Sequence, residues 1–210
     1  MNKKIIAVVG VVIVSSIAIF YLLKPQLVKI AGASMLPNFK EGQIVEIHPD
    51  YKKLQIGDVI AYKTTSNTIT KDTPRTEDAH RIVAVAGDTI SFDSAKEGLF
   101  RVKGITLSTQ NIGDYSDDKG VNYSVIKVTN QNQIFYTVMQ NKTNKHYLYM
   151  WAKTYKKEFP HTNGDMCNFD SAAFSCVVPK GYVFVAGDNL DNSLFGLVPV
   201  DNVLGIVTSY

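Results

Sequence analysis

Arg81-Ile-Val-Ala-Val85, followed at once by Ala86-Gly-Asp88, decides the expected fold, because a short run rich in β-branched residues ends there at a turn signal. The pattern recurs on both sides of it, in Asp58-Val-Ile-Ala-Tyr62 and in Tyr182-Val-Phe-Val185, which runs into Gly187-Asp-Asn189. Further runs of the β type cover residues 43–47, 89–92, 100–102, 123–128, 134–138, 146–151 and 203–207. Outside the N-terminal segment no amphipathic helical pattern exceeds about ten residues, so the fold is predicted to be mainly β.

The N-terminal segment from Ile5 to Leu23 contains 19 residues and no charge. A helix of that length reaches about 30 Å, the thickness of a bilayer core, and this predicts one transmembrane helix. Lys3 and Lys4 precede it, so the positive-inside rule favours a cytoplasmic N-terminus. We expect residues 1–24 to form a cytoplasmic tip and membrane anchor. Residues 25–210 would then form a β-rich domain on the outer, periplasmic or extracellular, face of the cell membrane.

A cleavable signal peptide is the alternative interpretation of this segment, since Ala31-Gly-Ala33 has the small-x-small form of a cleavage site. The apolar run is longer than the roughly 7–15 residues of a signal peptide, and seven residues separate Leu23 from Ala31. A retained anchor in the lipid bilayer is therefore preferred.

The composition excludes several classes of protein. Hydrophobic residues make up 45% of the 210, which is enough for a packed core. A net charge of +3 and the lack of any long Lys/Arg run argue against a nucleic-acid partner. Two cysteines are too few for a four-cysteine zinc site, and we expect no metal and no cofactor.

Residues from about 105 to 175 are richer in Asn, Thr, Lys, Asp and Tyr than the rest. They predict an inserted polar β-subdomain or a set of long loops. Cys167 and Cys176 lie near the end of this insertion with eight residues between them. Outside the membrane they favour a disulfide, and two reduced, buried thiols are the alternative.

Ser34 is the first candidate for chemistry, in Ala31-Gly-Ala-Ser-Met-Leu-Pro37. Gly32 permits an unusual backbone angle and the close approach of a substrate. Pro37 restricts the chain, and Met35 places an apolar side chain beside the hydroxyl. These features suit a nucleophile and its substrate-binding neighbours, although most serines in such surroundings are turn residues.

His80 is the second candidate, because an imidazole can take a proton from a serine hydroxyl near neutral pH. His48, His146 and His161 lack comparable surroundings, and His48 is expected to end a strand. The third candidate is Gly187-Asp-Asn-Leu-Asp-Asn-Ser193, whose acids and hydroxyl could orient the base. The alternative is a tight Asx turn, which needs no catalytic role.

The order of these segments along the chain, behind one N-terminal anchor, resembles that of the type I signal peptidases, a family of membrane-anchored serine peptidases. Ser34-Met-Leu-Pro37 is similar to the family's nucleophile box, and Gly57-Asp-Val-Ile-Ala-Tyr62 to its Gly-Asp box. Arg81–Asp88 resembles the following box, and residues 178–189 lead into a Gly-Asp-Asn box continued by Asp191-Asn-Ser193. The insertion has no counterpart that we can name.

The resemblance implies a signal-peptidase-like β-sheet catalytic domain whose site lies close to the membrane. It implies cleavage of exported preproteins after a small-x-small sequence, through an acyl-enzyme on Ser34. The backbone N–H of Ser34 would help to hold the oxyanion. Many members have a second serine where Gly32 stands, so that hydroxyl is missing here.

The resemblance also implies roles for the base and its neighbours. Bacterial members have a lysine where His80 stands, and a histidine there is similar to the endoplasmic-reticulum and archaeal branch. His80 is the preferred base, with Lys63 and Lys71 as nearby lysines outside the box.

Asp191 or Ser193 is the better candidate to contact the base. Asp188 and Arg81 are expected to be structural residues near the site, although Asp188 stays open as the orienting group. A further Asp and Arg that bacterial members carry after Ser193 are missing. This departure keeps two alternatives open: a specialised peptidase that matures pilin or another conjugation substrate, and a non-catalytic membrane-anchored β domain that binds partners.

Overall fold

The computed structural model of the chain is mainly β, as expected, and describes residues 24–49, 53–64, 77–93, 100–103, 108–130, 133–139, 167–169, 173–190 and 195–209. These residues contain fourteen strands, one 3-10 turn (η1, Val200–Asn202) and no α-helix. The strands are β1 Gln26–Lys29, β2 Ile44–His48, β3 Val59–Lys63, β4 Glu77–Val85, β5 Thr89–Asp93, β6 Phe100–Val102, β7 Ser108–Ser116, β8 Asn122–Asn130, β9 Gln133–Met139, β10 Cys167–Phe169, β11 Ala173–Val177, β12 Tyr182–Ala186, β13 Phe195–Pro199 and β14 Val203–Ser209.

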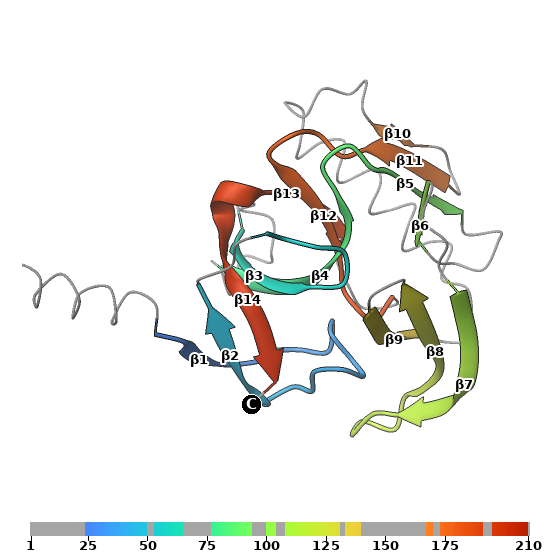
Figure 1. The fold of residues 1–210 in the computed structure, drawn as a ribbon. Coiled ribbons are helices and arrows are strands. Elements are labelled where there is room, and N and C mark those ends of the chain that lie inside the picture. The colour runs from blue at the N-terminus through green and yellow to red at the C-terminus, as the bar shows by residue number, and fades with distance from the viewer. Residues whose placement is uncertain are drawn as a thin grey trace, which may run out of the picture.

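The strands form three sheets, which Figure 1 shows side by side. The largest has seven strands in the order β1-β2-β14-β3-β4-β12-β13, so strands from both ends of the chain meet in it. A four-stranded sheet has the order β10-β11-β5-β6, and β7, β8 and β9 form a three-stranded sheet of their own. The pairs within them are antiparallel, as short β runs joined by tight turns predict.

The seven-stranded sheet buries apolar side chains on both of its faces. In β3 and β4, Val59 lies opposite Arg81 and Ile60 lies opposite His80. Because paired residues point to the same face, His80 shares its face with Ile60, and Arg81 shares the other face with Val59. Ile60 belongs to a buried cluster with Tyr62, Ile82, Val183, Val185, Val198 and Val203. The face of Val59 carries a separate cluster with Met35, Phe39, Val45, Ile47, Ala61 and Val207.

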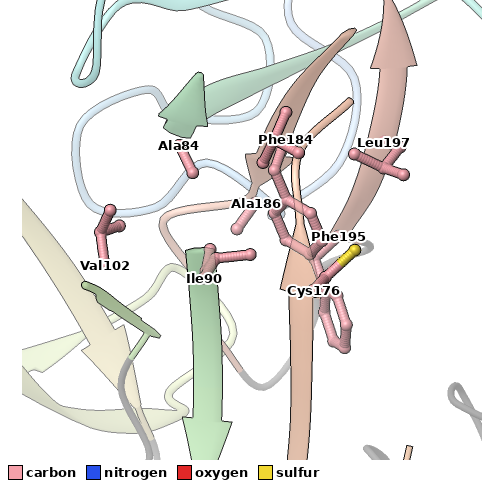
Figure 2. Packing of buried hydrophobic residues seen from close by; sticks show 9 residues of the cluster. Ala84, Ile90, Val102, Cys176, Phe184, Ala186, Phe195 and Leu197 are labelled. Atoms are coloured by element: carbon pink, nitrogen blue, oxygen red, sulfur yellow. The ribbon is translucent and has the colours of Figure 1, made fainter. Parts of the chain in front are cut away.

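A third cluster joins the seven-stranded sheet to the four-stranded one. Figure 2 shows Ala84, Phe184, Ala186 and Leu197 of the large sheet facing Ile90, Val102 and Cys176 of the small one. The rings of Phe184 and Phe195 stack there at 6.1 Å between centroids. This packing fixes the end of β12, from which residues 187–189 continue into the candidate site.

Several strands have less sequence signal than those predicted. In β7 eight of nine residues are exposed, so Ser108–Ser116 has no alternating apolar pattern to indicate a strand. In β1 only Val28 is not exposed, and β13 directly follows the polar segment after Gly187. The predicted run at 146–151 lies outside the described residues, and His48 ends β2 as expected.

The predicted anchor at 5–23 also lies outside the described residues. Within the part of the chain that is described, no helix is long and apolar enough to cross a membrane. The division of the chain at residues 24 and 25 stays a prediction.

Residues of the predicted insertion enter two different sheets. Among the described residues, β7, β8 and β9 pair with one another alone, whereas β11 pairs with β5 and also carries β10. Cys167 and Cys176 are register partners in β10 and β11. Cys176 is disulfide-bonded, and its partner is Cys167 because the chain has two cysteines. The predicted bridge therefore joins β10 to β11.

Candidate active site

Ser34 lies in a turn between β1 and β2 that is fixed by its own backbone and by buried neighbours. Backbone N–H groups of Leu36 and Phe39 donate to carbonyls at Ala33 and Met35, at 3.3 and 2.9 Å. The Met35 side chain, 2% exposed, anchors the turn in the cluster on the Val59 face of the sheet. Ser34 itself is half-buried, next to this buried anchor.

The backbone around Ser34 has the features that the sequence predicts. Gly32 has a φ of +82°, in the left-handed region that favours glycine. Pro37 follows a cis peptide bond. Leu36 is buried against Tyr123 of β8, so the turn also contacts the three-stranded sheet. In Figure 1 the blue segment between β1 and β2 reaches toward β9.

Asn189 holds the Ser34 turn from the far end of the sequence. Its backbone N–H donates to the Ser34 carbonyl at 2.9 Å, and its side-chain Nδ2 donates to the Ala33 carbonyl at 3.1 Å. Asn189 is fully buried. The predicted Gly-Asp-Asn segment after β12 therefore lies directly against the predicted nucleophile.

Asp188 and Arg81 form a buried ion pair beside this contact. Arg81 donates from Nε to Asp188 Oδ1 at 2.7 Å and from Nη2 to Oδ2 at 2.6 Å, and its Nη1 donates to the Gly57 carbonyl at 2.6 Å. Asn38 Nδ2 also donates to Asp188 Oδ2, at 2.7 Å. Burial raises the pKa of Asp188, while Arg81, Asn38 and, more weakly, His80 act to lower that pKa. The pair thus ties β4 to Asn38, at the far end of the Ser34 turn.

Thr137 brings the three-stranded sheet into the same network. Its hydroxyl, on β9, donates to the backbone carbonyl of Asp188, and both residues are buried. The predicted insertion therefore supplies a hydrogen bond to the residue that precedes Asn189.

His80 lies on β4 directly before Arg81 and is 1% exposed. Its Nδ1 is 2.7 Å from the hydroxyl of Tyr62 on β3, and its Nε2 is 4.0 Å from Oδ1 of Asp78. Burial first, and then the charge of Asp78, raises the pKa of Tyr62 well above its usual value of 10.0. Tyr62 therefore stays a neutral phenol that can both donate and accept.

Ser34 and His80 are not hydrogen-bonded to each other in the described part of the structure. Among the same residues, neither the Ser34 hydroxyl nor its backbone N–H has a hydrogen-bond partner. Catalytic hydrogen bonds of a substrate-free enzyme are often long and tighten when substrate binds. The pairing of Ser34 with His80 stays a prediction.

The other predicted site residues divide into two groups. Asp191, Ser193 and Lys71 lie outside the described residues. Lys63 is exposed at the end of β3, one position after Tyr62 and opposite Glu77. Asp188 and Arg81 are paired with each other.

The sequence does not indicate four members of this network. They are Asn38, Tyr62, Thr137 and the direct contact that Asn189 makes with the turn. Tyr62 had a usable signal, because a tyrosine expected inside a buried strand needs a partner for its hydroxyl. Thr137 had none, since it contacts Asp188 from 51 positions away. The described residues contain no group of three or more His, Cys, Asp or Glu that could hold a metal ion.

Comparison with known proteins finds a matching family and two relatives, and all of them are signal peptidases. The family model described as signal peptidase, peptidase S26, matches residues 1–210. The chain is 26% identical over 175 residues to Signal peptidase I of Buchnera aphidicola subsp. Schizaphis graminum (strain Sg), a match that covers 73% of this chain and 52% of that protein. It is 26% identical over 209 residues to Signal peptidase I of Aquifex aeolicus (strain VF5), covering 84% of this chain and 71% of that one. The chain thus spans about half the length of the first relative.

Proposed function

The chain belongs to the signal peptidase family, peptidase S26, and on that premise we propose that it is a serine endopeptidase that removes signal peptides from exported preproteins. Cleavage would follow a small-x-small sequence. Gly32, Met35 and Pro37 would shape the substrate-binding surface beside Ser34.

In the proposed reaction the Ser34 hydroxyl attacks the scissile carbonyl, and its proton passes to His80. The oxyanion that forms accepts a hydrogen bond from the backbone N–H of Ser34. The protonated imidazole then gives its proton to the leaving amine, which releases the mature chain and leaves the signal peptide as an ester on Ser34. A water molecule, deprotonated by the same imidazole, hydrolyses this ester and restores the hydroxyl.

One observation carries the proposal: Asn189 holds the carbonyls of Ala33 and Ser34 from the buried end of β12. The turn is thereby rigid at its backbone, while the Ser34 hydroxyl and N–H make no hydrogen bond within the described residues. A nucleophile and an oxyanion donor need this combination, because donors that are already in place cost no reorganisation during the reaction.

His80 is proposed as the base because it directly precedes Arg81, whose pair with Asp188 ties strand β4 to the turn, while the His80 ring itself lies on the other face of that strand. Arg81 is the next residue of β4, and Asp188 contacts Asn38 of the turn as well as preceding Asn189. Lys63 is exposed and Lys71 lies outside the described residues, so neither has comparable support.

The membrane anchor is part of the proposal. Residues 5–23 would span the cell membrane once, with the N-terminus in the cytoplasm and the catalytic domain on the outer face. The apolar, uncharged character of these 19 residues supports it. The site would then meet preproteins close to the lipid surface.

The test is cleavage of a purified preprotein by the detergent-solubilised full chain. Wild type should cut it, and Ser34→Ala and His80→Ala should lose the activity. Ser116→Ala and His48→Ala are matched controls, because both residues are partly exposed and belong to other contacts. A histidine base also predicts that activity declines as the pH falls through about 6–7.

Each outcome has a defined meaning. Equal cleavage by wild type and Ser34→Ala would refute the nucleophile. Loss with Ser34→Ala but not with His80→Ala, together with activity only at alkaline pH, would replace His80 by a lysine. No cleavage of any preprotein by a folded wild type would favour the anchored binding domain instead.

A further inference from the structure

We propose that Tyr62 is the positioning residue of His80, and that its hydroxyl holds Nδ1 so that Nε2 is the nitrogen that takes the Ser34 proton. The inference rests on the proposed function and deepens it. It assigns the orienting role of a catalytic triad to a neutral phenol on the neighbouring strand.

The placement of Tyr62 follows from the register of β3 and β4. Ile60 lies opposite His80 and Tyr62 lies opposite Asp78, so the tyrosine and the histidine are diagonal neighbours on one face. Both side chains are buried, and the hydroxyl is 2.7 Å from Nδ1. The two rings are tilted by 41° with centroids 5.9 Å apart, so the contact is a hydrogen bond and not a stack.

This contact decides which tautomer of His80 can act as a base. When Nδ1 carries the proton it donates to the Tyr62 oxygen, and Nε2 has a lone pair for the Ser34 proton. When Tyr62 donates to Nδ1, the proton sits on Nε2 and that nitrogen cannot accept. Once His80 has taken the Ser34 proton, both ring nitrogens carry hydrogen and only the first arrangement remains possible.

Tyr62 suits this role because it remains neutral. Burial and the nearby Asp78 raise its pKa, so the phenol neither ionises nor withdraws the Nδ1 proton at working pH. A neutral oxygen that accepts from Nδ1 stabilises the imidazolium formed during the reaction. Asp78, with Oδ1 4.0 Å from Nε2, adds a negative charge beside the same ring.

The remaining charges near His80 are committed elsewhere or lie outside the described residues. The Asp188 carboxylate is held by Arg81 and Asn38, and it acts on His80 through space. Asp191 and Ser193, the other predicted orienting groups, lie outside the described residues. Tyr62 hydrogen-bonds the His80 ring directly, at Nδ1.

The decisive variant is Tyr62→Phe, which keeps the ring in the core and removes only the hydroxyl. We expect kcat for preprotein cleavage to fall roughly 10–100-fold while KM stays within about twofold, as for loss of a partner that orients a catalytic group. Tyr182→Phe is the matched control, because that tyrosine lies on β12 and packs against the Phe184 cluster. Its kinetics should equal those of wild type.

A double-mutant cycle separates positioning from a merely structural effect. In a His80→Ala background the hydroxyl has no ring to orient, so adding Tyr62→Phe should change the residual rate by less than about twofold. A similar loss in both backgrounds would overturn the proposal. If His80→Ala cleaves normally while Ser34→Ala is inactive, the inference fails and the proposed function stands.

Nitrogen-15 spectra of the histidine rings give a readout independent of turnover. The chain has four histidines, and a His80→Gln spectrum assigns the signals of His80. In the wild type the Nδ1-protonated form should dominate, and Tyr62→Phe should shift the population toward the other tautomer. Identical His80 signals in the two proteins would refute the assignment even if Tyr62→Phe lowered the rate.

Discussion

Asp188→Ala is expected to be among the most destabilising single changes at the site. The substitution removes two hydrogen bonds of 2.6 and 2.7 Å from the Arg81 guanidinium and leaves that charge buried, although Nη1 keeps its bond to the Gly57 carbonyl. Asn38 loses its acceptor as well. Side-chain exposures of 9% for Arg81 and 2% for Asp188 mean that water does not replace these contacts.

The magnitude follows from the burial of the pair. Removing one partner of a buried ion pair costs about 3–5 kcal/mol, because the other charge stays uncompensated. For a chain of this size each kcal/mol lowers the melting temperature by about 2–4 °C, so the expected shift is about 6–20 °C. Thermal unfolding of the detergent-solubilised protein, followed by circular dichroism, measures it.

Lys119→Ala is the matched control for Asp188→Ala, since it breaks an ion pair whose two side chains are exposed to solvent. Lys119 Nζ and Glu41 Oε2 are 3.7 Å apart, with side chains 77% and 59% exposed. Such pairs contribute at most about 1 kcal/mol. Combining Arg81→Met with Asp188→Leu removes both charges and should recover part of the loss. The reasoning is refuted if Asp188→Ala melts within a few degrees of Lys119→Ala.

Three further changes have expected outcomes. Folding holds the pKa of Tyr62 above its unfolded value of about 10, so the free energy of unfolding keeps this contribution below pH 10 and falls by up to about 1.4 kcal/mol per pH unit above pH 10. Unfolding measured between pH 8 and 11 should show this fall in the wild type and lack it in Tyr62→Phe. Reduction of the Cys167–Cys176 bridge, which closes a loop of about ten residues, should cost about 2–3 kcal/mol, and a reductant that leaves the melting temperature unchanged would contradict this. In Gly205→Ala the new Cβ would overlap the backbone carbonyl of His48, so a loss of about 1–3 kcal/mol is expected, and an unchanged denaturant midpoint would disprove the clash.

The sequence was most informative where a strand is buried. Val59–Lys63 and Tyr182–Ala186 are predicted within one residue, because Gly57-Asp58 precede the first apolar run and Gly187 follows the second. Ser108–Ser116 is a strand only because β8 pairs with it, and its exposed polar residues carry no periodic signal. Pairing order was equally inaccessible, since β14 inserts between β2 and β3.

At the site, motifs predicted which segments matter but not how they touch. The box containing Ser34 and the Gly-Asp-Asn segment meet through Asn189, and no local pattern indicates that its amide reaches Ala33. The motifs favour Asp191 or Ser193, both after β12, as the partner of His80. The structure places Tyr62 beside His80, because the register of β3 and β4 sets the diagonal contact, and Asp191 and Ser193 lie outside the described residues.

The Thr137 hydroxyl on the Asp188 carbonyl has a practical consequence for anyone trimming this protein. Excising β7–β9 to obtain a smaller enzyme for crystallisation would remove the Thr137 hydroxyl. The buried carbonyl of Asp188, one residue before Asn189, would then lose its hydrogen-bond donor. It would also uncover Leu36, which Tyr123 of β8 covers. A minimal version should therefore keep this sheet, or graft a replacement donor and an apolar lid onto the shortened loop.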